Sequence, residues 1–235
     1  TASQYRTRES TRMQSTRHQT LTWRVYHDIV RLISSGKLVA GSRLDEQQIA
    51  NELGVSRTPL REAITRLVQD GLIENRPYRG NFVRKFTAKE VSDLYEVRKV
   101  LESLAVRLAT PHMTADTIAE LREILVEIDT ALKRSDMEAY GLADQHFHAA
   151  VAHHSGNDTL IAMLEQLRGQ IQLIRTMANQ NPDVVEITAM ERPEIVDAMA
   201  DGDADRAAQL MEEHIELVRR YTTSRFDPAP TQATD

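Results

Sequence analysis

The sequence predicts a mainly helical protein in two parts, and three observations support this. Aromatic residues make up only 5% of the 235 residues, whereas Leu, Ala, Glu and Arg, which favour helices, are plentiful. Apolar residues recur at helical spacing along most of the chain. The net charge also changes sign along the chain. Up to Phe86 there are 15 Lys and Arg and 8 Asp and Glu (net +7), and beyond it there are 14 Lys and Arg and 27 Asp and Glu (net −13). Such a change suggests two parts with different partners.

Composition excludes several classes of protein. The chain has no cysteine, which excludes disulfides and thiolate metal sites. No apolar run approaches the roughly 20 residues that span a bilayer, and the N-terminus lacks the apolar core of a secretory signal. We therefore expect a soluble, cytoplasmic protein with no membrane partner.

The first part is predicted to contain three helices and a hairpin. The expected helices span about residues 21–33, 45–53 and 57–70, and the expected strands span residues 72–74 and 81–84. Gly54 can end the second helix in a left-handed conformation, and Ser56 is placed to cap the third. The buried stripe of the third helix is expected to be Leu60, Ile64, Leu67 and Val68.

This order of elements is typical of a winged helix-turn-helix, whose third helix enters the major groove of DNA. Five arginines lie in or near the third helix and the hairpin: Arg57, Arg61, Arg66, Arg76 and Arg79. Such a run is usually a solvated face, but arginines here can pair with guanine. Arg79 and Gly80 suit the tip of a wing along the minor groove.

The second part is predicted to be an antiparallel six-helix bundle. Thr87 with Glu90, and Ser135 with Glu138, form capping-box patterns that begin helices. Thr114 and Asp158 are expected to cap two more, a break is expected at residues 179–183, and the last helices span about residues 184–200 and 203–221. In the first bundle helix the residues expected inside are Val91, Leu94, Val97, Leu101 and Leu104.

Three polar residues of the bundle are candidates for chemistry. Asp144 and His148 lie four residues apart and so share one face of a helix. They could begin a divalent metal site, or they could be a plain Asp–His pair or a buried histidine. Arg98 lies in an otherwise apolar stretch, where it could bind a ligand or pair with Glu102 four residues on.

Both parts carry a family resemblance. The stretch GKLVAGSRLDEQQIANELGVSRTPLREAITRLVQDGLIENRPYRGNFV resembles the DNA-binding domain of GntR-type bacterial transcription regulators. The stretches LYEVRKVLESLAVRLA, DQHFHAAVAHHSGNDTL and EIVDAMADGDADRAAQLMEEHI resemble the FadR C-terminal domain (FCD), an effector-binding helical domain. The organisation expected is a basic tail (1–18), a winged helix-turn-helix (19–86), an FCD-like bundle for effector binding and dimerisation (87–222) and a second tail (223–235).

The resemblance implies specific roles in DNA binding. It implies that Ser56, Arg57, Thr58 and Arg61 contact DNA and that Gly80 lies at the wing. Many relatives carry an arginine in the second helix where this chain has Gln47, so contacts to the operator could differ there. The basic tail would be either a disordered segment or an arm that gains order on DNA.

The resemblance also implies a ligand site. In metal-binding members one Asp and three His hold the ion, and Asp144, His148 and His214 fall on three of those positions. Arg192 stands where the fourth ligand is expected, and a guanidinium cannot ligate a metal. Either three ligands and waters hold a divalent ion (Zn, Ni or Mn), or the site has lost it. In both cases the arginines of the pocket, Arg98 and Arg192, favour a small carboxylate effector. The alternative is that Glu102 neutralises Arg98 and that Asp144 or Glu191 neutralises Arg192, which would leave an apolar pocket.

The function predicted is a homodimeric, ligand-responsive, sequence-specific DNA-binding regulator, interpreted as a repressor that binds an inverted-repeat operator. Two alternatives are a metal-dependent enzyme built on the bundle and an architectural DNA-binding protein that responds to no ligand. The chain contains no nucleotide-binding or hydrolase motif such as a P-loop or His-Glu-x-x-His, so we expect no enzymatic activity.

Overall fold

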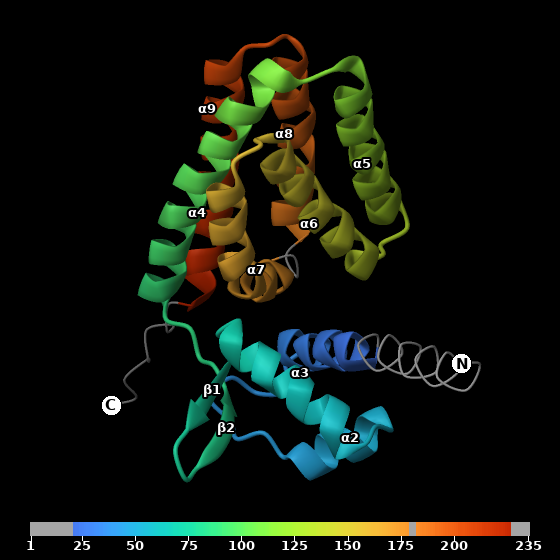
Figure 1. The fold of residues 1–235 in the computed structure, drawn as a ribbon, viewed down its shortest axis with the longest axis vertical. Helices are drawn as coiled ribbons and strands as arrows, with labels where there is room; N and C mark the ends of the chain where they lie inside the picture. Colours follow the sequence, from blue (N-terminus) through green and yellow to red (C-terminus); the bar gives the residue numbers. More distant parts are fainter. Residues whose placement is uncertain (1–20, 179–181, 227–235) are drawn as a thin grey trace, which may run out of the picture. The chain divides into compact units, whose positions relative to one another are not determined.

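The computed structural model of the protein describes residues 21–178 and 182–226 (Figure 1). It divides the chain into two compact units, residues 1–85 and 86–235, which are described separately below. The boundary lies one residue before the expected one. The expected basic tail, residues 1–18, lies outside the described residues.

The first unit is a winged helix-turn-helix, as predicted. Its elements are a helix over residues 21–34, α2 (Glu46–Leu53), α3 (Arg57–Gln69), β1 (Ile73–Arg76) and β2 (Gly80–Val83). Its core is formed by apolar side chains from every element: Val25, Ile29, Leu44, Ile49, Leu60, Ala63, Ile64, Leu67, Leu72 and Val83. Of the stripe predicted for α3, only Val68 is not fully buried.

Local sequence signals explain the turn and the wing. Asp45 caps α2 by accepting a hydrogen bond from the backbone N–H of Gln48, and Gly54 ends this helix with φ 64°. The strands are antiparallel, with Ile73 opposite Val83. Gly80 has φ 94°, and a Cβ there would lie 3.3 Å from Nε of Arg43. Only glycine combines this backbone conformation with so close a neighbour.

The second unit is a bundle of six long helices within the described residues (Figure 1). They are α4 (Ala88–Ala109), α5 (Ala115–Lys133), α6 (Met137–His154), α7 (Asp158–Ala178), α8 (Pro182–Ala200) and α9 (Ala204–Phe226), with a short 3-10 turn, η1 (Thr110–His112), after α4. Helices α4 and α9 lie side by side, α8 packs on α9, and α5 packs on α6 and α8. Helix α9 continues into residues 223–226, which were expected to belong to a tail.

Two of the expected helix caps in the bundle are wrong by one residue. The capping box of Thr87 and Glu90 is confirmed, and Thr114 caps α5. Helix α6 is capped by Asp136 rather than Ser135, because Ser135 adopts φ 55° in the turn before it. At the start of α7 the side-chain oxygen of Asn157 accepts from Leu160 N, while Asp158 is already the first helical residue.

The buried face of α4 also differs from the predicted one. Val91 is buried as expected, but Val97 and Leu104 are 50% and 39% exposed, and Leu94 and Leu101 are only partly buried. The face turned inward instead carries polar and aromatic side chains, Tyr95, Arg98, Glu102 and Ser103, beside the small aliphatic residues Ala105, Val106 and Ala109. Apolar periodicity was misleading here because the interior of the bundle is charged.

Candidate functional site

The exposed N-terminal end of α3 is the candidate DNA-binding surface. Arg57, Thr58 and Arg61 are all exposed. Ser56 occupies the cap position, but its hydroxyl makes no capping hydrogen bond. The side chains predicted to contact DNA on α3 are therefore gathered at the end of the helix that a major groove accepts.

Residues of α2 hold the arginines of α3 in place. Arg57 donates a 2.6 Å hydrogen bond to Oε1 of Gln47, whose amide donates to Asn51 at 3.0 Å. Arg61 forms a 3.4 Å ion pair with Glu46. Gln47 therefore positions Arg57 in this chain. Sequence reasoning did not single out Glu46.

The wing adds a second exposed surface. Arg79 is exposed beside Gly80, and Tyr78 at the same tip is fully exposed with φ 60°. An exposed aromatic residue in a left-handed conformation is uncommon, and Tyr78 was absent from the predicted contacts. Asn81 donates a 3.1 Å hydrogen bond to Glu46, which links the wing to α2.

Two of the five arginines noted in this region lie over aromatic rings of the same domain. The guanidinium of Arg66 lies 4.2 Å from the ring centroid of Trp23, and that of Arg76 lies 4.3 Å from the ring centroid of Phe82. Both contacts are cation–π interactions. The arginines best placed for DNA are thus Arg57, Arg61 and Arg79.

The bundle contains a buried polar cluster, which is the second candidate site. The buried cluster is defined by Arg98 and Glu102 of α4, Asp144 and His148 of α6, Arg175 of α7, Arg192 of α8 and His214 of α9. Each of these side chains is at most 8% exposed. Burying so many ionisable groups is costly unless they are paired, so the contacts among them determine whether the cluster is stable.

One end of the cluster is organised by Glu102. Arg98 donates from Nε to Glu102 at 2.6 Å, and the other carboxylate oxygen hydrogen-bonds Nδ1 of His148. Arg98 Nη2 also lies 3.3 Å from Nε2 of His148. The Arg98–Glu102 pair is the one anticipated from their spacing.

The other end is organised by Asp144. One of its carboxylate oxygens pairs with Arg192 and the other with Arg175. Arg192 further donates a 2.7 Å hydrogen bond to the backbone oxygen of Thr188 and a 3.3 Å bond to the Tyr140 hydroxyl. Arg175 was not among the predicted site residues, because its sequence neighbourhood carries no motif and only the fold brings it to Asp144.

The two histidines of the cluster lie next to each other but have different partners. Their rings stack with centroids 5.6 Å apart, and Nδ1 of His214 lies 2.8 Å from Glu191. Burial lowers the pKa of both His148 and His214, and the nearby Arg98 and Arg192 lower it further. Glu102 opposes this shift for His148 without overcoming it. Both rings are therefore neutral at neutral pH.

Burial alone would raise the pKa of Glu102, but Arg98 and His148 outweigh it and hold that pKa well below the usual range. The fully buried part of the cluster therefore has three positive guanidiniums and two carboxylates, Glu102 and Asp144. The remaining carboxylate, Glu191, is partly exposed at the edge. The buried charges leave one excess positive charge.

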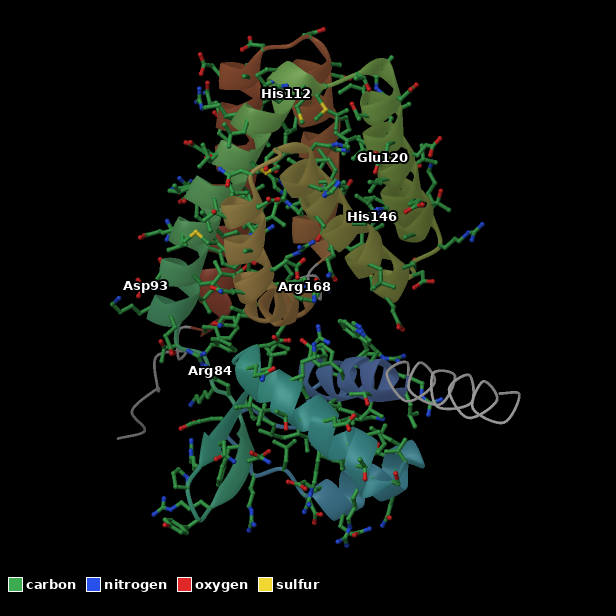
Figure 2. The ribbon with its side chains drawn as sticks, viewed as in Figure 1. Arg84, Asp93, His112, Glu120, His146 and Arg168 are labelled. Carbon is green, nitrogen blue, oxygen red and sulfur yellow. The ribbon has the colours of Figure 1, made fainter. Side chains whose placement is uncertain are left out.

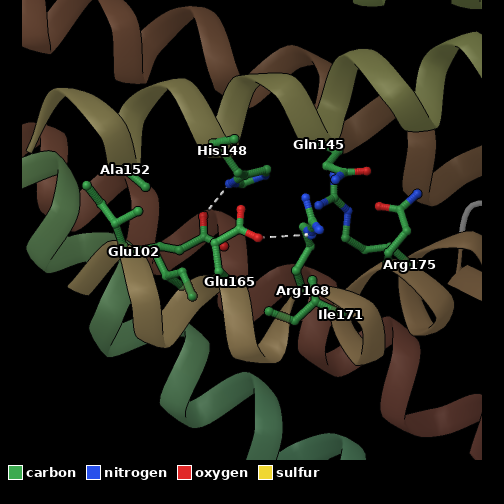
Figure 3. A pocket seen from close by; sticks show the side chains of 12 residues that line it. Glu102, Gln145, His148, Ala152, Glu165, Arg168, Ile171 and Arg175 are labelled. Carbon is green, nitrogen blue, oxygen red and sulfur yellow. Dashed lines mark hydrogen bonds and ion pairs between the residues drawn. The ribbon is translucent and has the colours of Figure 1, made fainter. Parts of the chain in front are cut away.

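A small cavity lies beside the cluster, between α6 and α7 (Figure 3). Its volume is about 60 Å³, several times the roughly 10–15 Å³ that one water needs. From the cluster, Glu102, His148 and Arg175 line the cavity, and Glu165 and Arg168 are the other charged residues of its lining. Arg98, Arg192, Asp144 and His214 are not among the described residues that line it.

The donor set of the cluster does not fit a divalent metal. Both oxygens of Asp144 are held by arginines, and Nδ1 of His148 is bonded to Glu102. Among the residues that the structure describes, no three His, Asp or Glu side chains are grouped so that they could hold an ion. Arg192, a proton donor, occupies the side of Asp144 where a metal would need a lone pair.

The other histidines of the bundle lie outside the cluster. His112 and His146 are exposed on the surface of the bundle, as Figure 2 shows. His154 lies 3.2 Å from Glu120 of α5. Within the described residues, no helix is apolar and long enough to cross a membrane.

The fold and its exposed α3 surface define a DNA-binding transcriptional regulator. The model for bacterial regulatory proteins of the gntR family matches residues 21–83, and the model for the FCD domain matches residues 93–217. The chain belongs to the gntR family and carries an FCD domain. Members of these families are transcriptional regulators, so the chain is a regulator and not an enzyme.

Named relatives agree with this assignment. The chain is 34% identical to the HTH-type transcriptional regulator McbR of Escherichia coli over 64% of its length and 68% of McbR. It is 34% identical to the Nta operon transcriptional regulator of Aminobacter aminovorans over 75% of its own length and 82% of that protein. It is 24% identical to the E. coli transcriptional repressor RspR over 85% and 88%. The solved structure of E. coli McbR/YncC superposes with a TM-score of 0.74 at 26% identity, covering 88% of this chain and 99% of that one.

Proposed function

We propose that this regulator is a homodimeric repressor in the cytoplasm whose bundle binds a small organic acid and thereby changes its affinity for an inverted-repeat operator. The observation that carries the proposal is the excess positive charge of the buried cluster beside a cavity. A buried cation without its own counter-ion is unfavourable, and an organic anion would supply the missing charge. Repression is inferred from the relative RspR, which is named a repressor.

Unused hydrogen-bond donors support the same ligand. Within the described residues, Nη1 of Arg98, Nε of Arg192 and the hydroxyl of Tyr95 are buried without a hydrogen-bond partner. Native proteins rarely leave such groups unsatisfied. Arg98 and Arg192, the residues predicted to bind the effector, thus keep donors free although each is ion-paired. Because neither arginine lines the cavity, an acid bound there would satisfy these donors through water.

The exposed face of α4 supports the homodimer. Its apolar residues repeat at intervals of three and four: Leu94, Val97, Leu101, Leu104 and Leu108. Val100, on the same side, is 62% exposed. This spacing is the one by which two helices pack as a pair, so we assign the face to a second copy of the chain. Two copies would present two winged helices to a two-fold operator.

The test is operator binding with and without organic acids. The promoter region next to the gene would be labelled, and binding measured by fluorescence anisotropy while short mono- and dicarboxylic acids are added. We expect specific binding at an inverted repeat, and a change in affinity of about 5–150-fold with the correct acid, the usual size of allosteric coupling. Sedimentation of the protein with Val97→Glu should show a shift from dimer to monomer. An operator affinity that no metabolite changes would favour the architectural alternative.

A further inference from the structure

We propose that the acid's carboxylate is bound by Arg175 from the cavity side, without a divalent metal, and that the acid is a small monocarboxylate with a short apolar tail. This inference deepens the proposed function, because it names the ligand class and the residue that binds it. Four features of the cavity and its charges carry it.

The first feature is where Arg175 lies. Its guanidinium forms an ion pair with Asp144 of the buried cluster. Arg175 also lines the cavity (Figure 3). Arg98 and Arg192 are not among the described residues that line the cavity. Of the three buried arginines, Arg175 is therefore the one that a molecule in the cavity can contact directly.

The second feature is that the counter-ion of Arg175 is shared. Asp144 carries one negative charge and faces both Arg175 and Arg192. The other carboxylates at the cavity are already matched, since Glu102 pairs with Arg98 and Glu165 lies 3.3 Å from Arg168. Burial lowers the pKa of Arg175 to about 9, and the positive charge of Arg98 lowers it further. A carboxylate in the cavity balances the charge of Arg175 with a two-pronged bond.

The third feature is the apolar part of the cavity lining. It is formed by Ala149, Ala152, Ile161, Leu164 and Ile171. A short hydrocarbon chain would be buried there at a gain of about 0.8 kcal/mol per methylene. The second carboxylate of a diacid would instead meet these apolar residues, the carboxylates of Glu102 and Glu165, or Arg168, whose charge Glu165 already offsets. It would therefore gain less than the first carboxylate.

The fourth feature is that a metal is not needed. In a metal-dependent acid site the ion supplies the positive charge that holds the carboxylate. Here Arg192 and Arg175 occupy both oxygens of Asp144 and supply that charge themselves. Binding of the acid is thus independent of chelators.

The experiment is calorimetric titration of the full-length protein with acetate, butyrate and hexanoate, and with succinate and butyramide as a diacid and an uncharged comparison. Each titration is run with and without EDTA. The variants are Arg175→Gln and the matched control Arg168→Gln, an arginine seven residues earlier on α7 that also reaches the cavity wall but is paired with Glu165. Thermal unfolding checks that each variant is folded, and Arg175→Lys, which keeps the charge, serves if Arg175→Gln is not.

We expect a monocarboxylate of the series to bind, EDTA to leave its affinity unchanged, and succinate and butyramide to bind at least about tenfold more weakly, the loss of one charge-assisted bond. Arg175→Gln should bind the acid at least about tenfold more weakly than the parent. Arg175→Lys should lose less affinity, because lysine keeps the charge but cannot make a two-pronged hydrogen bond. Arg168→Gln should bind the acid nearly as tightly as the parent.

Equal affinity of the parent and Arg175→Gln would overturn the assignment to Arg175. Loss of binding in EDTA that Zn²⁺ restores would overturn the metal-independent site. These outcomes are distinguishable from failure of the proposed function. If succinate alone bound and released the operator, the proposed function would stand and this inference would fail. If only a neutral metabolite released the operator, the organic-acid effector of the proposed function and the monocarboxylate inferred here would both be wrong.

Discussion

The winged helix and the bundle both depend on arginines, but they hold them in opposite environments. On α3 the side chain of Arg61 is 70% exposed and its ion pair with Glu46 is 3.4 Å long. In the bundle, Arg98 and Arg192 are 1% and 2% exposed and are fixed by short ion pairs and hydrogen bonds. Under the proposed function, the same chemical group would serve two kinds of recognition, of DNA and of a small acid.

The difference follows from the two anions. DNA is a long polyanion, and exposed, movable arginines can bind it through many weak, salt-dependent contacts. A small acid offers only one charge, so its site must be dry and preorganised before the ligand arrives. Exposed arginines should thus matter for function alone, whereas the buried charges should matter for folding as well. Four tests address this difference between the two units.

The largest effect is expected from Asp144→Asn. The change leaves Arg175 and Arg192 without their shared carboxylate inside the bundle. Removing one partner of a buried ion pair typically costs about 3–5 kcal/mol of unfolding free energy. Urea denaturation would measure it. The matched control is Asp205→Asn, which breaks the exposed pair with Arg107 and should cost at most about 1 kcal/mol. Equal losses in the two variants would mean that Asp144 is not in a dry site.

The second effect concerns DNA and should leave folding unchanged. Arg57→Ala and Arg61→Ala should each weaken operator binding by about 1–3 kcal/mol if they contact bases, because both are exposed at the end of α3. Their unfolding free energies should stay within about 0.5 kcal/mol of the parent. Arg220→Ala, an exposed arginine on α9, is the control for loss of charge. Native affinity in both α3 variants would remove α3 as the recognition helix.

The sequence predicted the winged helix better than the cluster, and specific residues show why. Asp45, Gly54 and the α3 stripe are local signals, and each acts within a few residues of itself. The face of α4 was wrong because Val97 and Leu104 are as apolar as core residues and give no sign that they point outward. Arg175 was missed because its meeting with Asp144 depends on the packing of α7 against α6. Contacts between distant helices leave no periodic trace in the chain.

The third effect concerns metal content. Arg192→His should raise the divalent metal bound by the purified protein, because it frees one oxygen of Asp144 and adds a neutral nitrogen ligand on the side of His148 and His214. The parent should bind less metal than the variant, and elemental analysis after dialysis against Zn²⁺ would compare them. Arg98→His, which changes the other end of the cluster, should gain less. A parent that keeps one ion per chain through chelation would show that Arg192 does not block the site.

The smallest effect tests whether a capping position on the DNA-binding surface is used for folding or for DNA. Ser56 and Asp45 occupy equivalent positions at the start of α3 and α2, but only Asp45 makes the capping hydrogen bond. Asp45→Ala should therefore cost about 1 kcal/mol of unfolding free energy, whereas Ser56→Ala should cost a few tenths at most. Operator binding should change in the opposite order, because the unused Ser56 hydroxyl can donate to a phosphate and the carboxylate of Asp45 would only repel one. Chemical denaturation and anisotropy on the same two proteins give both numbers. If Ser56→Ala destabilised the fold as much as Asp45→Ala and left operator affinity unchanged, Ser56 would be a structural cap, and the separation between residues for folding and residues for DNA would not extend to the start of α3.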